Sequence, residues 1–246
     1  IISDYKKIYV MMKRYGATVA FDAASFSSHD NLDADYFDAL FLSPHKLLGG
    51  VGSCGLLAIR KELVKSDKPT FAAGGTVSYV SRSSHFFASS VERTEEGGTQ
   101  HVMGLIRAAL AYRLRNEVGL DVIKSREDEL ARLFCEGLDN IPEVVSYFPR
   151  AVPRLPIFAF NVRGVSPYDF AEALSEDYGV QTRAGCACAG PYGHDLLGLK
   201  DDQKFDQKPG WVRVSLHYSH TPKDVAYLLK AIKKTIKKFK TKKDKK

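Results

Sequence analysis

The chain has 246 residues, of which 44% are hydrophobic and 26% are charged. That composition is typical of a folded globular protein and suffices for one large or two modest hydrophobic cores. No apolar run approaches the length needed to span a membrane, so we expect no membrane partner.

The formal net charge of +7 is concentrated at the C-terminus. The stretch 230–246 holds ten lysines and one aspartate, or +9, which leaves −2 for the rest of the chain. We interpret these lysines as the solvated face of a terminal helix. Because neither interleaved aromatic residues nor a recognised nucleic-acid motif accompanies them, we predict no nucleic-acid partner.

The N-terminal part of the chain alternates between short apolar runs and polar turns. After a helical pattern at 5–15, the runs 17–21 and 39–42 predict two buried strands. A third run, 54–59, follows after only a glycine-rich turn. Such a turn is too short for a crossover helix and predicts an antiparallel neighbour, so we expect a mixed sheet.

Polar residues follow the first two predicted strands. Asp22 comes directly after the first, and the segment Ser43-Pro44-His45-Lys46 comes directly after the second. Open α/β sheets bind their ligands beyond the carboxyl ends of the strands, so an acid and a lysine would share one crevice. A lysine held in such a turn is what an enzyme needs to form a Schiff base with a carbonyl cofactor.

The C-terminal part has a different pattern. A helical stretch that begins near His101 gives way at Gly119 to a second helix at 120–138. We therefore predict two domains, one at 1–118 and a smaller α+β domain at 119–246 that ends in the lysine-rich tail. The remaining expected elements are a strand at 156–162, a helix at 166–178, a glycine-rich loop at 183–193, a strand at 211–216 and a last helix from Thr221.

The motifs at 22–25 (Asp-Ala-Ala-Ser) and 43–46 (Ser-Pro-His-Lys), with the glycine-rich hairpin that follows, resemble the class V aminotransferase family and in particular its cysteine desulfurase branch. The resemblance covers nearly the whole chain but only the C-terminal portion of the family's pattern. It implies that pyridoxal 5'-phosphate is the cofactor. It also implies an α/β fold, in which 1–118 is part of the mixed-sheet large domain of fold type I. We expect the chain to be a fragment that lacks the family's earlier cofactor-binding segment.

The resemblance assigns roles to the lysine and to four residues near it. Lys46 resembles the lysine that forms the Schiff base, and Asp22 resembles the carboxylate beside the pyridine nitrogen. Ser43 and His45 resemble phosphate ligands, since a hydroxyl and an imidazole can hold phosphate by charge-assisted hydrogen bonds. Ser25 stands where the desulfurases usually carry a glutamine that bonds the cofactor's phenolic oxygen, and its shorter side chain is our candidate for that contact.

Three further residues take roles from the same resemblance. Thr99 ends a Glu-Gly-Gly-Thr stretch similar to the family segment that reaches the cofactor phosphate of the partner subunit, so a homodimer is implied. Cys188 resembles the cysteine that attacks the sulfur of the substrate, although Cys186 leaves open which thiol is reactive. Arg213 resembles the arginine that binds the substrate carboxylate, and a planar guanidinium can grip that group by two parallel hydrogen bonds.

The cysteines do not predict a metal site. Cys54 falls in an apolar run and Cys135 in a helical stretch, where each is expected to be a small core residue. Cys186 and Cys188 together offer at most two zinc ligands.

The favoured function is a pyridoxal-phosphate-dependent cysteine desulfurase, which converts the amino acid L-cysteine to L-alanine and leaves a persulfide for a sulfur-acceptor protein. A class V aminotransferase or a related lyase on the same cofactor would need Lys46, Asp22 and Arg213 but not Cys188. An alternative of another class is a non-catalytic C-terminal fragment or interaction module. The expected location is cytoplasmic, with any targeting information in a preceding segment.

Overall fold

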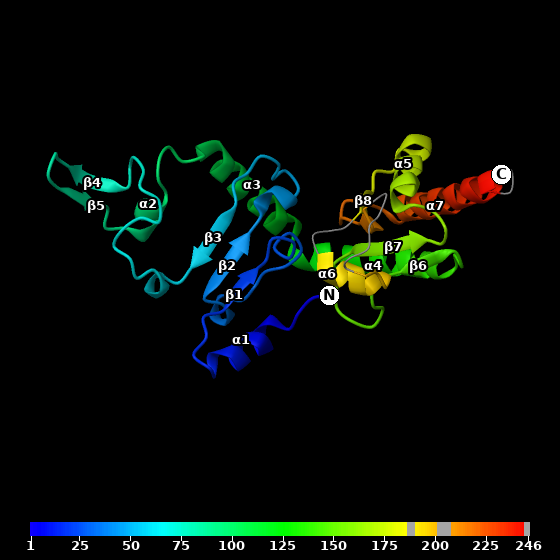
Figure 1. Cartoon of the computed structure of the whole chain (residues 1–246), viewed down its shortest axis with the longest axis horizontal. Coiled ribbons are helices and arrows are strands. Elements are labelled where there is room, and N and C mark those ends of the chain that lie inside the picture. The colour runs from blue at the N-terminus through cyan, green and yellow to red at the C-terminus, as the bar shows by residue number, and fades with distance from the viewer. Residues whose placement is uncertain (186–189, 201–207, 244–246) are drawn as a thin grey trace. The chain divides into compact units, whose positions relative to one another are not determined.

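The computed structural model describes residues 1–185, 190–200 and 208–243. The chain forms two compact units, one of Ser3–Leu120 and one of Asp121–Lys246 with Ile1–Ile2. Figure 1 shows that each unit contains its own sheet and helices. The two units are therefore described one after the other.

The main sheet of the N-terminal unit is mixed, as the sequence predicts. β1 (Ala20–Asp22) pairs in parallel with β2 (Ala39–Leu42), and β2 pairs in antiparallel fashion with β3 (Leu56–Ile59). The first strand begins later than the predicted 17–21. Its backbone is diverted just before β1, because the N–H of Val19 donates to the Asp38 carboxylate at 2.8 Å instead of to a neighbouring strand.

Helices and a hairpin make up the rest of the described N-terminal unit. They are α1 (Tyr5–Lys13), β4 (Val77–Val80), β5 (His85–Phe87), α2 (Val91–Glu95), α3 (Val102–Val118) and short 3-10 helices at Ala34–Tyr36, Pro44–Lys46 and Lys61–Leu63. The hairpin of β4 and β5 was not expected from the sequence. α3 ends where predicted, at Gly119, whose φ of +89° suits a residue without a Cβ atom.

The C-terminal unit has the expected α+β architecture. Its four strands form an antiparallel sheet in the order β6, β7, β9, β8. The strands are β6 (Val144–Ser146), β7 (Ile157–Val162), β8 (Arg183–Gly185) and β9 (Trp211–Ser215), and the helices are α4 (Leu120–Asp139), α5 (Pro167–Tyr178), α6 (Gly190–Leu197) and α7 (Pro222–Lys243).

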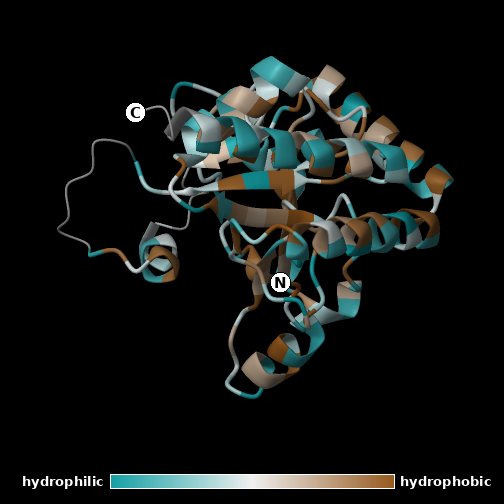
Figure 2. Ribbon diagram, turned by 90° about the vertical axis from the view of Figure 1, so that its right-hand side faces the viewer, coloured by the Kyte–Doolittle hydropathy of each residue, from teal (hydrophilic) through white to brown (hydrophobic). Residues whose placement is uncertain are grey.

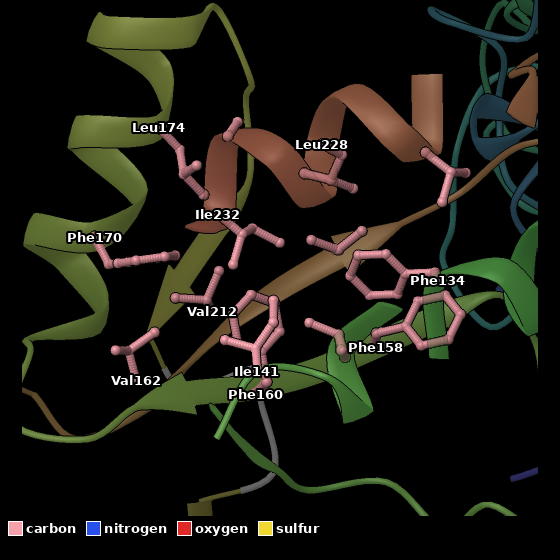
Figure 3. Packing of buried hydrophobic residues seen from close by; sticks show 14 of the residues in the cluster. Phe134, Ile141, Phe158, Phe160, Val162, Phe170, Leu174, Val212, Leu228 and Ile232 are labelled. Atoms are coloured by element: carbon pink, nitrogen blue, oxygen red, sulfur yellow. The ribbon is translucent and has the colours of Figure 1, made fainter. Parts of the chain in front are cut away.

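Aromatic side chains form the centre of the C-terminal unit (Figure 3). Phe158 and Phe160 of β7 lie among Phe134 of α4 and Phe170 of α5, and all four are fully buried. The rings of Phe134 and Phe158 meet edge to face with centroids 4.7 Å apart. Burying each ring stabilises the fold by about 1.5–3 kcal/mol. The hydrophobic colour of the sheet strands in Figure 2 marks this interior.

The prediction of a loop over 183–193 is wrong in the part that the structure describes. Arg183–Gly185 forms β8, which pairs with β9, and Gly190–Leu197 forms α6. Glycine suits the end of β8 because a Cβ atom at Gly185 would lie 2.7 Å from the hydroxyl of Tyr168, and its φ is +103°. This pairing joins residues far apart in the sequence, so the local glycine pattern does not show it.

The start of α7 agrees with the sequence. The Asp224 carboxylate accepts from the N–H of Thr221 at 2.7 Å, and Thr221 Oγ1 accepts from the N–H of Asp224 at 3.3 Å. This reciprocal pair satisfies two N–H groups that have no partner inside the helix.

Among the helices that the structure describes, none is both long and apolar enough to cross a bilayer. Over the same residues, no three metal-ligating side chains form a group that could hold an ion.

Candidate active site

The carboxyl ends of β1 and β2 lie next to each other because the two strands are parallel. Asp22 pairs in register with Phe41, so the carboxylate lies beside the end of β2, which leads into Ser43. A hollow of about 650 Å³ opens here, and it is lined by Asp22, Ala24, Phe41, Leu42, Ser43, Gly55, Leu56 and Leu57. The structure thus brings Asp22 and Ser43 to one hollow.

Lys46 ends the short 3-10 helix Pro44–Lys46 that follows β2. Its Nζ donates a hydrogen bond to Ser25 Oγ at 3.1 Å. Ser25 lies in the turn that begins at Asp22, so the turns after the two strands bring the lysine and the acid to the same end of the sheet. Lys46 and Asp22 are both exposed, and the amine is accessible from solvent.

The glycine-rich turn after Lys46 folds tightly back on this 3-10 helix. A Cβ atom at Gly50 would lie only 1.9 Å from the carbonyl oxygen of Pro44, so the turn requires glycine. Two side chains hold the turn from the other side, one from α3 and one from the residue that precedes this helix. Arg107 Nη1 donates to the carbonyl of Val51 at 2.8 Å, and His101 Nε2 donates to that of Gly52 at 3.2 Å.

Three polar groups close to Lys46 can receive a ligand. One oxygen of Asp22 accepts from the N–H of Ala24 at 2.8 Å, which orients the carboxylate and leaves its second oxygen for another partner. His45 is exposed on the same 3-10 helix as Lys46. The Ser43 hydroxyl makes no capping bond to that helix. The four consecutive residues 43–46 therefore supply the hydroxyl of Ser43 and the imidazole of His45 beside the amine of Lys46.

Sequence reasoning missed Arg115, a buried arginine of α3 that holds the turn after Asp22. Its guanidinium donates to the carbonyl of Ser27 and, at 2.6 Å, to the side-chain oxygen of Asn31, and it lies 5.0 Å from the ring centre of Tyr112. Burial lowers the pKa of Arg115, while Tyr112 and Asp30 raise it.

One sequence signal could have found Arg115. The buried positions of α3 are Gly104, Ala108, Ala111 and Arg115, which recur at helical spacing. An arginine that continues a stripe of small residues on the buried face needs acceptors, and here they are main-chain and amide oxygens of the 27–31 turn.

Thr99 lies between α2 and α3, at a second hollow of the N-terminal unit. This hollow of about 990 Å³ is also lined by Cys54, Glu96 and His101, and it shares the segment 55–57 with the hollow at Asp22. Lys46 lines neither of the two. Within one copy of the chain, Thr99 therefore lines a different hollow from Ser43 and Asp22.

Arg213 belongs to the C-terminal unit and lies on β9. It is half-buried and pairs in register with Ala159 of β7 on one side and with Arg183 of β8 on the other. Residues directly opposite on neighbouring strands share a face of the sheet, and like charges there are destabilising. Arg213 and Arg183 therefore share one face of the sheet.

Cys188, the nucleophile expected from the sequence, and Cys186 lie outside the described residues. The other two cysteines are half-buried free thiols. Cys54 precedes β3 instead of lying within it, whereas Cys135 lies on α4 against the hydrophobic core, where Arg154 donates to its sulfur at 2.9 Å.

A mixed sheet with an acid at the end of one strand and a lysine after the next, followed by a small α+β unit, is the arrangement found in fold type I pyridoxal-phosphate enzymes. The chain belongs to one family within that class. The sequence model of the family, described as Aminotransferase class-V, matches residues 1–228.

Curated relatives and solved structures agree with this assignment. A probable cysteine desulfurase of Pyrococcus abyssi is 30% identical over 240 residues, covering 96% of this chain and 57% of the relative. A probable cysteine desulfurase of Staphylococcus aureus is 30% identical over 224 residues, covering 90% of this chain and 51% of the relative.

Two solved structures share the fold closely. The cysteine desulfurase of Thermococcus onnurineus matches with a TM-score of 0.84 at 30% identity, over 96% of this chain and 57% of that one. The cysteine desulfurase CsdA of Escherichia coli matches with a TM-score of 0.83 at 26% identity, over 96% of this chain and 56% of that one. The chain thus spans little more than half the length of the relatives that it matches.

Proposed function

We propose that this chain forms part of a cysteine desulfurase, which converts L-cysteine to L-alanine and leaves a persulfide on the enzyme. The observation that carries the proposal is the convergence of Lys46, Ser25 and Asp22 at the carboxyl ends of two parallel strands, in a chain of the class V aminotransferase family. The relatives named above support the choice of cysteine as the substrate.

The residues at this site fit pyridoxal 5'-phosphate, the cofactor of the family. Asp22 offers an acceptor oxygen for a protonated ring nitrogen, and Ser43 and His45 offer donors to a phosphate on the same short segment as Lys46. A hollow of about 650 Å³ has the size of a small-molecule site. When bound, the cofactor supplies an electron sink for the electrons released at the substrate's Cα.

Each side chain has a defined task in this proposal. Lys46 holds the cofactor covalently through Nζ and, once released as a free amine, takes the proton from the substrate's Cα. Asp22 keeps the proton on the ring nitrogen, because its fixed carboxylate favours the charged form of that ring. Ser25, as the hydrogen-bond partner of Nζ, orients the amine.

Arg213 and Arg183 provide the complement to the substrate carboxylate. They lie opposite each other on β9 and β8, so both side chains are on one face of the sheet and can approach the same carboxylate. A guanidinium can also hold that group by two parallel hydrogen bonds. We propose that Arg213 is the main ligand, because it is the less exposed of the two.

Cys188 is the proposed nucleophile for the sulfur. Its thiolate forms a bond to the sulfur of cysteine while the carbon–sulfur bond breaks, so the sulfur stays on Cys188 as a persulfide and the carbon skeleton leaves as alanine after protonation. A thiol of an acceptor protein would then take this sulfur. Cys186 is the alternative thiol.

A homodimer and a cytoplasmic location are part of the proposal, both on family grounds. One observation supports the dimer. α3 exposes the aliphatic side chains of Leu105, Ile106, Leu110 and Leu114, a strip that is unfavourable in water. A partner subunit would cover such a strip and would bring its own Thr99 to a cofactor phosphate.

A second candidate is an aminotransferase or lyase of the same family that does not use a cysteine. The described site around Lys46 would serve it equally well, because no step there needs a thiol. Measuring sulfide and alanine release from L-cysteine with the wild type and with Cys188→Ser separates the two functions. Loss of sulfide release in the variant is expected, whereas unchanged turnover would favour the second candidate.

Reduction with borohydride in the presence of pyridoxal phosphate tests the site itself. We expect a visible absorbance band and a phosphopyridoxyl adduct on Lys46, detected by mass spectrometry, and we expect both to be absent in Lys46→Ala. Lys68→Ala is the matched control, because Lys68 is an exposed lysine of the same unit that lines neither of the two hollows. A chain that forms neither band nor adduct would support the alternative of a non-catalytic fragment or interaction module.

A further inference from the structure

The C-terminal helix α7 separates an apolar face from a strongly basic one. Most of its aliphatic residues belong to the core, while its lysines between 223 and 240 are exposed. Two of these lysines have carboxylate partners in the C-terminal unit, Lys238 with Asp177 and Lys240 with Glu143. The lysines of α7 that form no ion pair with any described residue include Lys230, Lys233, Lys234 and Lys237.

A groove runs between α7 and the turn that joins α4 to β6. It has a volume of about 370 Å³, and Lys233, Lys237 and Lys240 line it on the helix side. Ile141 and Ile236, each only 5% exposed, form its apolar floor. Positive charge and apolar surface therefore meet in one concave place, which distinguishes it from the rest of the lysine-bearing face.

The charges around this groove favour an anionic occupant. Glu143 is the one carboxylate that lines it, and its hydrogen bond with Lys240 lowers the pKa of that carboxyl, so the pair stays ionised at neutral pH. Lys233 and Lys237 remain without a counter-charge in the described structure. The groove consequently has a net charge of +2, three lysines against one glutamate.

A smaller hollow extends the groove beyond the Lys240–Glu143 pair. It has a volume of about 80 Å³ and is lined on its far side by Val162, Arg163 and Phe239. Arg163 is anchored there, since its Nη1 donates to the carbonyl of Pro142 at 2.6 Å. The two hollows together offer both apolar and cationic groups, which suits an extended chain with side chains of both kinds.

We propose that this groove binds an acidic segment of a partner protein, with an apolar side chain on the floor of Ile141 and Ile236 and carboxylates against Lys233 and Lys237. A protein segment fits better than a nucleic acid for two reasons. The larger hollow has an aliphatic floor that an apolar side chain can contact, and its lining residues include no aromatic ring on which a base could stack.

Fluorescence anisotropy with the whole chain tests this proposal. The probe is a labelled 12-residue synthetic peptide with glutamates on both sides of two central leucines. We expect Lys233→Glu combined with Lys237→Glu to weaken its binding by about tenfold or more at low salt. The matched control is Lys124→Glu combined with Lys223→Glu, exposed lysines of α4 and α7 outside the groove, with an expected loss of less than about twofold.

Two comparison probes make the test decisive, and circular dichroism verifies that each variant is folded. A peptide with serines in place of the leucines should bind several-fold more weakly, because the apolar floor then has no occupant. Equal losses in the two double variants would overturn the proposal, since overall charge would then explain the binding. Tighter binding of a 12-nucleotide single-stranded DNA than of the peptide would also overturn it.

Discussion

The amine of Lys46 donates a hydrogen bond to the hydroxyl of Ser25 at 3.1 Å, and this contact joins the turns that follow two parallel strands. The turn of Ser25 follows directly on Asp22, the last residue of β1, and the N–H of Ala24 in this turn orients the Asp22 carboxylate. Because both turns start from paired strands, the position of the amine relative to the acid depends on the sheet as well as on the loops.

Replacing Ser25 by glutamine should strengthen cofactor binding. The resemblance places an amide of that length against the cofactor's phenolic oxygen, and one added hydrogen bond contributes about 0.5–1.5 kcal/mol, or roughly two- to tenfold in Kd. Titration of the chain with pyridoxal phosphate, followed by absorbance, measures this. Ser28→Gln, on the same turn, is the control, and equal behaviour of the two variants would contradict the assignment of Ser25.

Replacing Gly50 by alanine should disrupt the turn that presents Lys46. The new methyl group would overlap the carbonyl oxygen of Pro44, which lies 1.9 Å away, and the backbone must move to relieve the clash. We expect a loss of about 1–3 kcal/mol in the free energy of unfolding, measured by urea denaturation. Gly74→Ala, where a Cβ atom meets nothing within 4 Å, should change stability by less than about 0.5 kcal/mol.

Replacing Arg115 by methionine should loosen the turn that carries Asp22 and Ser25. The variant leaves the carbonyl of Ser27 and the amide oxygen of Asn31 without their donor, at a cost of about 2–4 kcal/mol. Hydrogen exchange of the 23–31 amides and urea denaturation measure the effect.

The control for this variant is Arg113→Met on the same helix. Among the described residues, Arg113 pairs with Glu117 alone, and both side chains are largely exposed, so its loss should cost less than about 0.5 kcal/mol. If Arg115→Met showed the same amide hydrogen exchange and the same stability to urea as the control, the proposed role of Arg115 in holding the turn would be wrong.

Asp38 should make the stability of the N-terminal unit depend on pH. Its burial alone would raise the pKa of the carboxyl, but the hydrogen bonds from the N–H of Val19 and from Lys13 outweigh that effect and lower it. A carboxyl with a lowered pKa in the folded state stabilises the fold above its unfolded pKa of about 4 and loses this contribution as the pH falls through the folded pKa.

The corresponding test compares the wild type with Asp38→Asn. At pH 7 the variant should be less stable by about 1–3 kcal/mol, and the difference should shrink as the pH falls from about 5 to about 2. Asp35→Asn, an exposed aspartate of the same unit, serves as the control and should show little difference at any pH. A difference in unfolding free energy between the wild type and Asp38→Asn that grows toward low pH would contradict a lowered pKa of Asp38.

The elements that could be predicted from the sequence are those that local chemistry specifies. Short apolar runs between polar turns identified the strands around Asp22 and the lysine turn, and the pair of Thr221 and Pro222 identified the start of α7. The mixed sheet followed from the length of one connection. Such features depend on residues that are neighbours in the chain, so a single sequence contains the information they need.

Tertiary structure decided what depends on distant partners. β8 became a strand because β9 supplies its hydrogen bonds, although its own sequence has the glycines of a loop. Arg115 holds the 27–31 turn because that turn provides hydrogen-bond acceptors, and Ile141 and Ile236 line one groove because α7 packs on the core of the C-terminal unit. In each case the stabilising contact joins groups far apart in the chain, and no local sequence pattern can specify that they lie close together.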